Sequence, residues 1–209
     1  MSGGSEPVVH LHRGDLPADV ALGPAVAVDT ETMGLNPHRD RLCLVQLSAG
    51  DGVCHLVQFA PAHYDAPVLR ALLEDRAVEK LFHFGRFDLA ILQHYLGADC
   101  GPVYCTKLAS RLTRTFTDRH GLRDLCRELL GVDLSKQQQT SDWGAAELNE
   151  AQLRYAATDV LYLHRLRVEL DRLLVREQRT ELARAAFAFL PARARLDLLG
   201  WPEVDIFAH

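Results

Sequence analysis

The first half of the chain alternates between short apolar, β-branched runs and clusters of turn residues. Runs of this kind predict strands. The predicted strands are Val8–His12, Ala25–Thr30, Leu42–Ser48, Val53–Gln58 and Lys80–Phe84. The Ala49–Gly52 segment has the composition of a hairpin loop, so the second, third and fourth strands are expected to form an antiparallel meander.

The second half of the chain has apolar residues at helical spacing. Helices are predicted over Pro67–Asp75, Phe87–Leu96, Leu108–Leu112, Leu122–Leu130, Glu150–Leu174 and Glu177–Phe189, with a short one after Ser141 and Asp142. Gly131 occupies a C-terminal cap position, and Pro191 is expected to end the last helix. Because strands and helices alternate after residue 66, the expected fold class is α/β, with a mixed sheet of antiparallel meander and parallel strands flanked by helices.

A chain of 209 residues is expected to form one domain with short appended segments. Residues 1–7 are small and polar and are interpreted as a disordered N-terminus. Residues 8–190 form the domain. Residues 191–209 form a tail with several large apolar side chains, which is expected to pack on the domain or on a neighbouring subunit.

Composition restricts the class of protein. The formal charge of −5 disfavours a protein that grips long nucleic acid, and favours a short substrate or a local basic patch. Five cysteines without a C-x-x-C spacing argue against disulfides or structural zinc. No apolar run is long enough for a membrane span, and no secretory signal precedes the domain. A cytoplasmic location is therefore expected.

Acidic residues stand at the points where predicted elements meet. Asp29 and Glu31 end a buried strand and share one face of it, Asp88 begins a helix, and Tyr155 and Asp159 lie one turn apart. Each acid has a plain structural explanation when taken alone. The strand end is solvated, the helix dipole favours Asp88, and Asp159 pairs with an arginine such as Arg123 or Arg165.

Taken together, the same acids indicate a metal site. Parallel βα architecture brings strand ends and helix starts to one edge of the sheet. Four carboxylates at such an edge suit hard cations, and two Mg²⁺ or Mn²⁺ ions about 4 Å apart assist phosphodiester hydrolysis. The predicted catalytic residues are Asp29, Glu31, Asp88, Tyr155 and Asp159, of which the four acids bind metal. Tyr155 would position the attacking water by a hydrogen bond.

Three segments resemble the motifs of the DEDD exonuclease superfamily. Val28–Thr32 (VDTET) followed by Gly34 resembles the first motif, and Phe82–Leu92 (FHFGRFDLAIL) resembles the second. Tyr155–Leu166 (YAATDVLYLHRL) resembles the third in the Tyr-x-x-x-Asp form, which marks the DEDDy branch that includes ribonuclease D. The resemblance implies a divalent-metal-dependent 3′–5′ exonuclease.

Longer runs resemble the nanoRNase C family, whose members are stand-alone bacterial exonucleases acting on dinucleotides. The runs are GLNPHRDRLCLVQLS, CTKLASRLTRTFTDRHGL, SKQQQTSDW and the ending DLLGWPEVDIFAH. This resemblance implies an RNase H-like fold, diribonucleotides such as pGpG as preferred substrates, 5′-mononucleotides as products and a homo-octamer.

Candidate substrate contacts lie beside the motifs and in a locally basic segment. The resemblance implies that the Leu35 side chain inserts as a wedge between the two bases of the substrate. The alternative is that Leu35 is a core leucine in a turn. Between residues 107 and 136, seven cations oppose four acids, so the segment is net positive against an acidic chain and suits phosphate binding. The predicted substrate-binding residues are Thr30, Leu35, His83, Phe84, Lys107, Arg111, Lys136, Gln137 and Gln138.

Three other functions remain open on the sequence. The same chemistry would serve ribonuclease D-like trimming of longer RNA, or an exonuclease acting on single-stranded or duplex DNA. A non-catalytic scaffold that binds nucleic acid is the third reading, and it is disfavoured because all four acids and the tyrosine are present.

Overall fold

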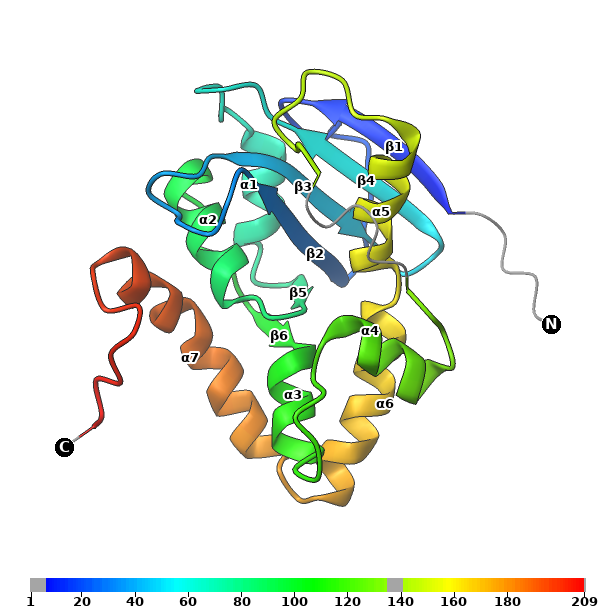
Figure 1. Ribbon diagram of the computed structural model, residues 1–209, viewed down its shortest axis with the longest axis vertical. Coiled ribbons are helices and arrows are strands. Elements are labelled where there is room, and N and C mark those ends of the chain that lie inside the picture. The colour runs from blue at the N-terminus through cyan, green and yellow to red at the C-terminus, as the bar shows by residue number, and fades with distance from the viewer. Residues whose placement is uncertain (1–6, 135–140, 209) are drawn as a thin grey trace.

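A six-stranded sheet lies at the centre of the protein, in a computed structural model that describes residues 7–134 and 141–208. The strands are β1 (Val8–Arg13), β2 (Ala25–Thr32), β3 (Leu42–Ser48), β4 (Val53–Gln58), β5 (Glu79–Phe82) and β6 (Val103–Cys105). Their spatial order is β1-β4-β3-β2-β5-β6 (Figure 1).

The pairing confirms the predicted mixed sheet. Strands β2, β3 and β4 form the antiparallel meander. Strand β1 runs parallel to β4 at one edge, while β5 and β6 continue from β2 as parallel strands at the other. Strand β6 was not predicted, because three residues are too few to show a period.

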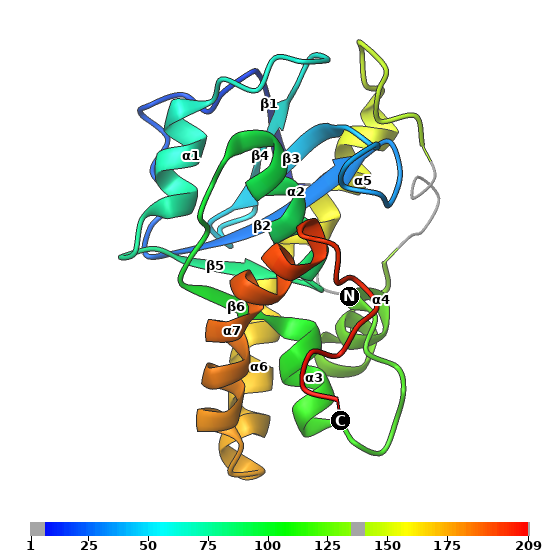
Figure 2. The same ribbon diagram turned by 90° about the vertical axis from the view of Figure 1, so that its left-hand side faces the viewer.

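Helices cover both faces of the sheet and extend beyond its end. They are α1 (Pro67–Glu74), α2 (Arg86–Leu96), α3 (Thr106–Thr113), α4 (Leu122–Leu125), the π-helical turn η1 (Cys126–Leu130), α5 (Glu150–Leu161), α6 (Leu163–Arg176) and α7 (Thr180–Leu198). Helices α1 and α5 lie on opposite sides of the sheet (Figure 2). Helices α3, α6 and α7 pack together below the sheet in Figure 1. Within the described residues, no helix is long and apolar enough to cross a membrane.

The prediction of a single helix over Glu150–Leu174 was wrong, because the chain breaks at Tyr162. Before the break, α5 packs on the sheet, and after it α6 packs against α3. Both helices bury an apolar stripe, so the 3.6-residue period continues across the junction and hides it.

Two further helix predictions were wrong. Helix α7 continues through Pro191 to Leu198, so the tail leaves the domain later than expected. Pro191 has no backbone N–H and removes one helical hydrogen bond there. The end of the helix is stabilised because Arg86 donates a hydrogen bond of 2.6 Å to Asp197. The residues after Ser141 form turns instead of a helix, with Asp142 accepting from the Gly144 amide.

The tail after α7 lies on the domain while leaving much of its apolar surface in water. Arg86 and Arg193 donate to the carbonyl oxygen of Pro202, and the Phe207 ring lies 6.0 Å from that of Phe189. The exposed apolar residues of the tail are Leu199, Trp201, Val204, Ile206 and Phe207.

Candidate active site

Three predicted acids converge where β2 ends beside α5. Asp29 and Glu31 share one face of β2, and α5 packs on that strand with Asp159 in its third turn. One carboxylate oxygen from each of the three lies within 4.8 Å of the others. Oxygen atoms this close are arranged to coordinate one hard cation.

The fourth acid approaches from the other side of the same strand. Asp88 lies in the first turn of α2 and is 5% exposed. The Thr30 hydroxyl donates a hydrogen bond of 2.6 Å to the Asp88 Oδ1 atom. The role of Thr30 in this structure is therefore to hold the Asp88 carboxyl beside Asp29.

Within residues 7–134 and 141–208, no ion pair to a lysine or arginine compensates the four carboxyls. Burial, followed by repulsion from neighbouring acids, raises the pKa of Asp29 well above its ordinary value, that of Glu31 to about 9 and that of Asp159 to about 7. Burial also raises the pKa of Asp88 to about 7. Among the described residues no ion pair joins Asp159 to an arginine, so the ion-pair explanation for this acid is wrong. A divalent cation fits the cluster, since it supplies the missing charge and takes oxygen ligands.

Tyr155 lies one turn before Asp159 on the same face of α5. Its ring packs 6.1 Å from that of Trp143. Burial first, and then the nearby carboxylates, raise the pKa of the Tyr155 phenol above its usual range. A phenol held neutral in this way is suited to hydrogen bonding and is a poor base.

A cleft of about 330 Å³ opens over the carboxylates. Its lining combines the predicted catalytic residues with groups from the helical side. The lining residues are Asp29, Glu31, His83, Gly121, Leu122, Arg123, Asp124, Leu134, Tyr155 and Asp159.

His83 presents a defined hydrogen-bonding face to this cleft. The Thr106 hydroxyl donates to the Phe82 carbonyl at 3.2 Å, so it accepts from His83 Nδ1 at 2.9 Å. The other ring nitrogen, Nε2, is then an acceptor. Burial, and secondarily the Lys107 charge, lower the pKa of His83 to about 3, so the imidazole stays neutral and keeps this arrangement.

Two apolar side chains near the motifs are exposed. Leu35 is 84% exposed, so the core-leucine alternative is wrong. Phe84 is 51% exposed, has a backbone φ of 66° and carries the Lys107 ammonium 3.8 Å from its ring centroid. A bulky residue at positive φ is strained, and the adjoining turn holds it there.

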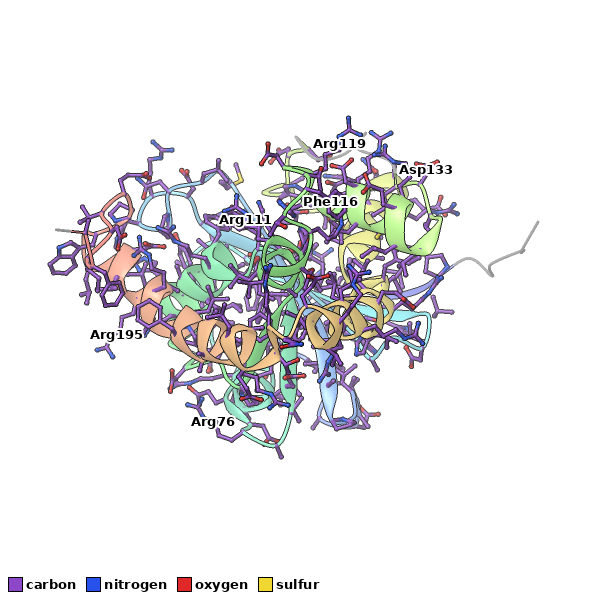
Figure 3. The ribbon with its side chains drawn as sticks, turned by 90° about the horizontal axis from the view of Figure 1, so that it is seen from below. Arg76, Arg111, Phe116, Arg119, Asp133 and Arg195 are labelled. Carbon is purple, nitrogen blue, oxygen red and sulfur yellow. The ribbon has the colours of Figure 1, made fainter. Side chains whose placement is uncertain are left out.

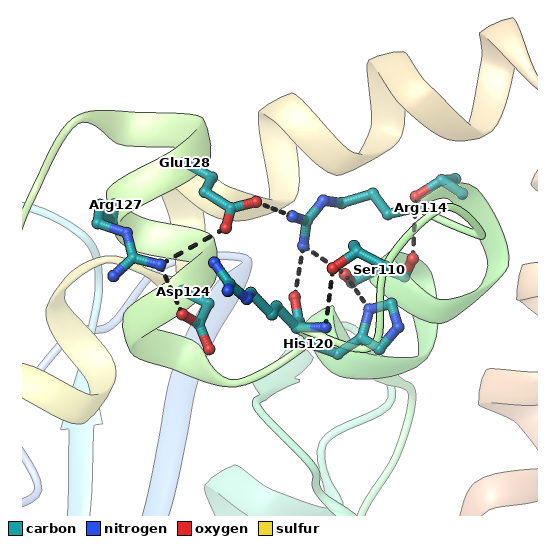
Figure 4. A network of polar contacts seen from close by, with 9 residues as sticks. Ser110, Arg114, His120, Asp124, Arg127 and Glu128 are labelled. Atoms are coloured by element: carbon teal, nitrogen blue, oxygen red, sulfur yellow. Dashed lines mark hydrogen bonds and ion pairs between the residues drawn. The ribbon is translucent and has the colours of Figure 1, made fainter.

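Two arginines of the basic segment between residues 107 and 136 pair with acidic groups of the protein itself. Arg114 is 2% exposed and bonds Glu128, Ser110 Oγ and the Arg119 carbonyl (Figure 4). Arg127 pairs with both Asp124 and Glu128 in the same network. Arg114 joins the loop between α3 and α4 to η1, and Arg127 pairs with acids of α4 and η1, so these two cations do not add to a phosphate-binding surface.

Other cations of the segment face outward. Arg111 and Arg119 are exposed and lie on the side of the molecule seen in Figure 3, where Phe116 also projects. Arg123 lines the cleft. The predicted contacts Lys136, Gln137 and Gln138 lie outside the described residues.

Sequence reasoning missed two residues of the site. Gln46 donates to Asp29 at 3.4 Å from the neighbouring strand, and Trp143 packs beside Tyr155. An amide inside the otherwise apolar run LCLVQLS was the available signal for Gln46. No local pattern pointed to Trp143, because its contact depends on how the loop before α5 folds back.

Comparison with known proteins places this site in a family. The 3′–5′ exonuclease family model matches residues 15–175. The chain therefore belongs to the 3′–5′ exonucleases, and its Tyr-x-x-x-Asp motif puts it in the DEDDy branch with ribonuclease D. It is a phosphodiester hydrolase, and its carboxylate cluster is suited to divalent-metal-dependent catalysis.

Within that family the chain is similar to NrnC of Brucella melitensis. The structure of that protein bound to pGG superposes with a TM-score of 0.94 at 57% identity, covering 97% of this chain and 99% of that one. NrnC with bound Mg²⁺ superposes with a TM-score of 0.93 at 57% identity over the same shares of each chain. Ribonuclease D of Gluconacetobacter diazotrophicus is 36% identical over 83% of this chain, which spans 44% of that relative.

The carboxylate cluster predicts an unusual pH dependence of stability without metal. In the folded chain the pKa is about 7 for Asp88 and Asp159 and about 9 for Glu31, whereas the ordinary values of these groups are near 4. Between about pH 4 and about pH 9 the folded chain therefore binds more protons than the unfolded chain. In chelator the free energy of unfolding should therefore fall as the pH rises from about 4 to about 9. Mg²⁺ should remove most of that slope. Thermal unfolding across this pH range, with and without Mg²⁺, measures both effects.

The Asp159→Asn variant provides the comparison. At pH 8 in chelator it should melt about 5 °C higher than the unaltered chain, because one repelling charge is gone. Mg²⁺ should also raise the melting temperature of this variant less than that of the unaltered chain. The exposed Asp133→Asn variant serves as the matched control and should follow the unaltered chain. Equal melting temperatures of all three proteins in chelator would contradict the proposed repulsion between the carboxylates.

Proposed function

We propose that this exonuclease hydrolyses very short RNA from the 3′ end, preferentially dinucleotides such as pGpG, and releases 5′-mononucleotides. The observation that carries the proposal is the likeness over 97% of the chain to a Brucella protein solved with pGG. That likeness extends over 99% of the Brucella chain, whereas the chain spans less than half of the curated ribonuclease D relatives.

Exposed side chains around the cleft support a substrate of two bases. Leu35 follows the first acidic pair directly and is almost fully in water, so it is available to lie between adjacent bases. Phe84 is also exposed and offers a ring for stacking, with the positive charge of Lys107 3.8 Å from its centroid. His83 Nε2 offers an acceptor to a sugar hydroxyl.

The proposed chemistry rests on Asp29, Glu31, Asp88 and Asp159 holding two divalent cations, Mg²⁺ or Mn²⁺. When bound, such ions supply a nucleophilic water and charge stabilisation for the leaving 3′ oxygen. Tyr155 donates or accepts a hydrogen bond that orients the water toward the phosphorus atom. Gln46 and Thr30 keep the Asp29 and Asp88 carboxyls in place.

A substrate-length series tests the dinucleotide preference. The value of kcat/KM should be highest for the RNA dinucleotide and should fall as the length rises to about ten nucleotides. Leu35→Ala should lower kcat/KM on dinucleotides about 10- to 100-fold, because one base-stacking contact is lost. Leu182→Ala, which removes another exposed leucine on α7, should change nothing.

The alternatives predict other outcomes of the same series. A rate that rises with length would favour ribonuclease D-like trimming of longer RNA. Equal or faster cleavage of DNA would favour a DNA exonuclease. Absence of hydrolysis of every substrate with Mg²⁺ or Mn²⁺ would leave only a nucleic-acid-binding scaffold.

The role of Tyr155 has its own test. Tyr155→Phe should lower kcat about 100- to 10,000-fold with little change in KM, because the phenol acts on the water and not on the substrate. Tyr162→Phe, at the junction of α5 and α6, is the matched control and should retain activity. A large rise in KM at unchanged kcat would assign Tyr155 to substrate binding instead.

We also propose that the exonuclease is a homo-oligomer, with the octamer of the nanoRNase C family as the expected size. The exposed apolar side chains of residues 199–207 support an interface between subunits. Light scattering of the purified protein should give the mass of eight chains. The Trp201→Ser, Phe207→Ser double variant should give smaller particles, and a monomeric mass for the unaltered protein would contradict the proposal.

A further inference from the structure

Three histidines gather on the sheet face opposite Asp29, Glu31 and Asp159. His10 and His12 are two residues apart on β1, and His10 pairs directly with His55 on β4. Leu11 and Leu56 are in register with Gln46 and Asp29, so they face the active site while the three histidines face away from it. The cluster is therefore separate from the carboxylate site.

The three imidazole rings are close neighbours. The ring centroids of His10 and His12 lie 5.2 and 5.3 Å from that of His55, and 6.5 Å from each other. His12 Nε2 lies 3.0 Å from His55 Nδ1. His10 and His12 share one face of β1, and His55 on β4 supplies a third imidazole to the cluster.

We propose that His10, His12 and His55 form a second metal site, which takes a first-row transition ion of the zinc class. Imidazole nitrogens bind Zn²⁺, Co²⁺, Ni²⁺ and Cu²⁺ in preference to Mg²⁺, which prefers the oxygen ligands of the catalytic cluster. The chain thus carries one site for hard cations and one for borderline cations, on opposite faces of the sheet.

Closing on an ion requires a side-chain adjustment and a change of tautomer, in which the proton between His12 Nε2 and His55 Nδ1 moves to the other nitrogen of its ring. Two nitrogens on a tetrahedral Zn²⁺ lie about 3.3 Å apart, close to the 3.0 Å between His12 and His55. The rings of such ligands are centred roughly 5 Å apart, so His10 must approach His12 by more than 1 Å. His10 is exposed, and rotation of an exposed side chain supplies that movement.

The surroundings favour a bound cation. Burial, followed by the neighbouring imidazoles, lowers the pKa of both His12 and His55, so these rings are neutral and able to ligate near pH 7. Asp19 and Asp51 act in the opposite direction and contribute negative charge beside His12 and His55. In the bound state each neutral ring carries its proton on the nitrogen that does not ligate, so the tautomer changes but binding requires no net proton release.

A bound ion would join the edge strand to the body of the sheet. Strand β1 pairs only with β4 among the described strands, and β1 stands at the outer edge (Figure 1). Two ligands on β1 and one on β4 would cross-link these strands through side chains. Zn²⁺ would then stabilise the edge independently of the catalytic metal.

Zinc titration tests the site on the full chain carrying Asp29→Asn and Asp159→Asn, which weaken the carboxylate site. With excess Mg²⁺ present, calorimetry should detect one Zn²⁺ per chain. Replacing either His10 or His12 by Gln should raise the dissociation constant at least tenfold. His38→Gln is the matched control, since His38 and His94 form a two-ring cluster at 5.2 Å, and it should leave the affinity unchanged.

Co²⁺ spectroscopy adds a readout of coordination. The visible absorption of tetrahedral Co²⁺ should appear with the parent and the His38→Gln protein, and should be lost in His10→Gln and His12→Gln. Circular dichroism checks that both variants fold, and His10 is exposed enough for its variant to do so. Unchanged Zn²⁺ affinity in the His10 and His12 variants, or no Zn²⁺ binding by the parent, would overturn the proposal without bearing on exonuclease activity.

Discussion

Repulsion among four carboxyl groups is the constraint around which this protein is organised. Asp29 and Glu31 on β2 meet Asp159 from α5, and Asp88 reaches them from α2. Like charges in a partly buried cleft destabilise the fold unless cations or protons compensate them. The remaining structure holds these groups together despite that cost, which is the arrangement expected of a metal-dependent hydrolase.

Two local structures set the positions of the acids. Helix α5 begins with a capping box, in which Asn149 accepts from the Gln152 amide and the Gln152 side chain accepts in return. This fixes the start of the helix and thereby places Tyr155 and Asp159 over β2. The turn before α2 is equally restricted, because a Cβ atom on Gly85 would lie 2.6 Å from the Phe82 side chain. That turn places His83 in the lining of the cleft and leads into the helix that carries Asp88.

The sequence was informative wherever chemistry coincided with a local period. The strand ending in Asp29 and Glu31, and the Tyr155–Asp159 spacing on one helical turn, were predictable because alternation and helical period fix which side chains share a face. The break at Tyr162 and the continuation through Pro191 were not, since tertiary packing overrides local preference at both. The exposure of Leu35 and the pairing of Arg114 with Glu128 in another element also follow from no local period.

The reaction and the choice of substrate depend on different features of the chain. Exonuclease chemistry follows from the family and is consistent with the converging acids, whereas the proposed substrate length is argued from exposed residues such as Leu35 and Phe84. Arg114 and Arg127 show why a net positive segment is a weak guide to phosphate binding, since both are paired within the protein.

The most direct test of the account is to locate the metal. Crystals soaked in Mn²⁺ should give anomalous scattering peaks between the carboxylates of Asp29, Glu31 and Asp159, and beside Asp88. The peaks should disappear in crystals of the Asp29→Asn, Asp159→Asn double variant. Absence of any Mn²⁺ peak at the carboxylates of the unaltered protein, at concentrations that support hydrolysis, would contradict the central claim.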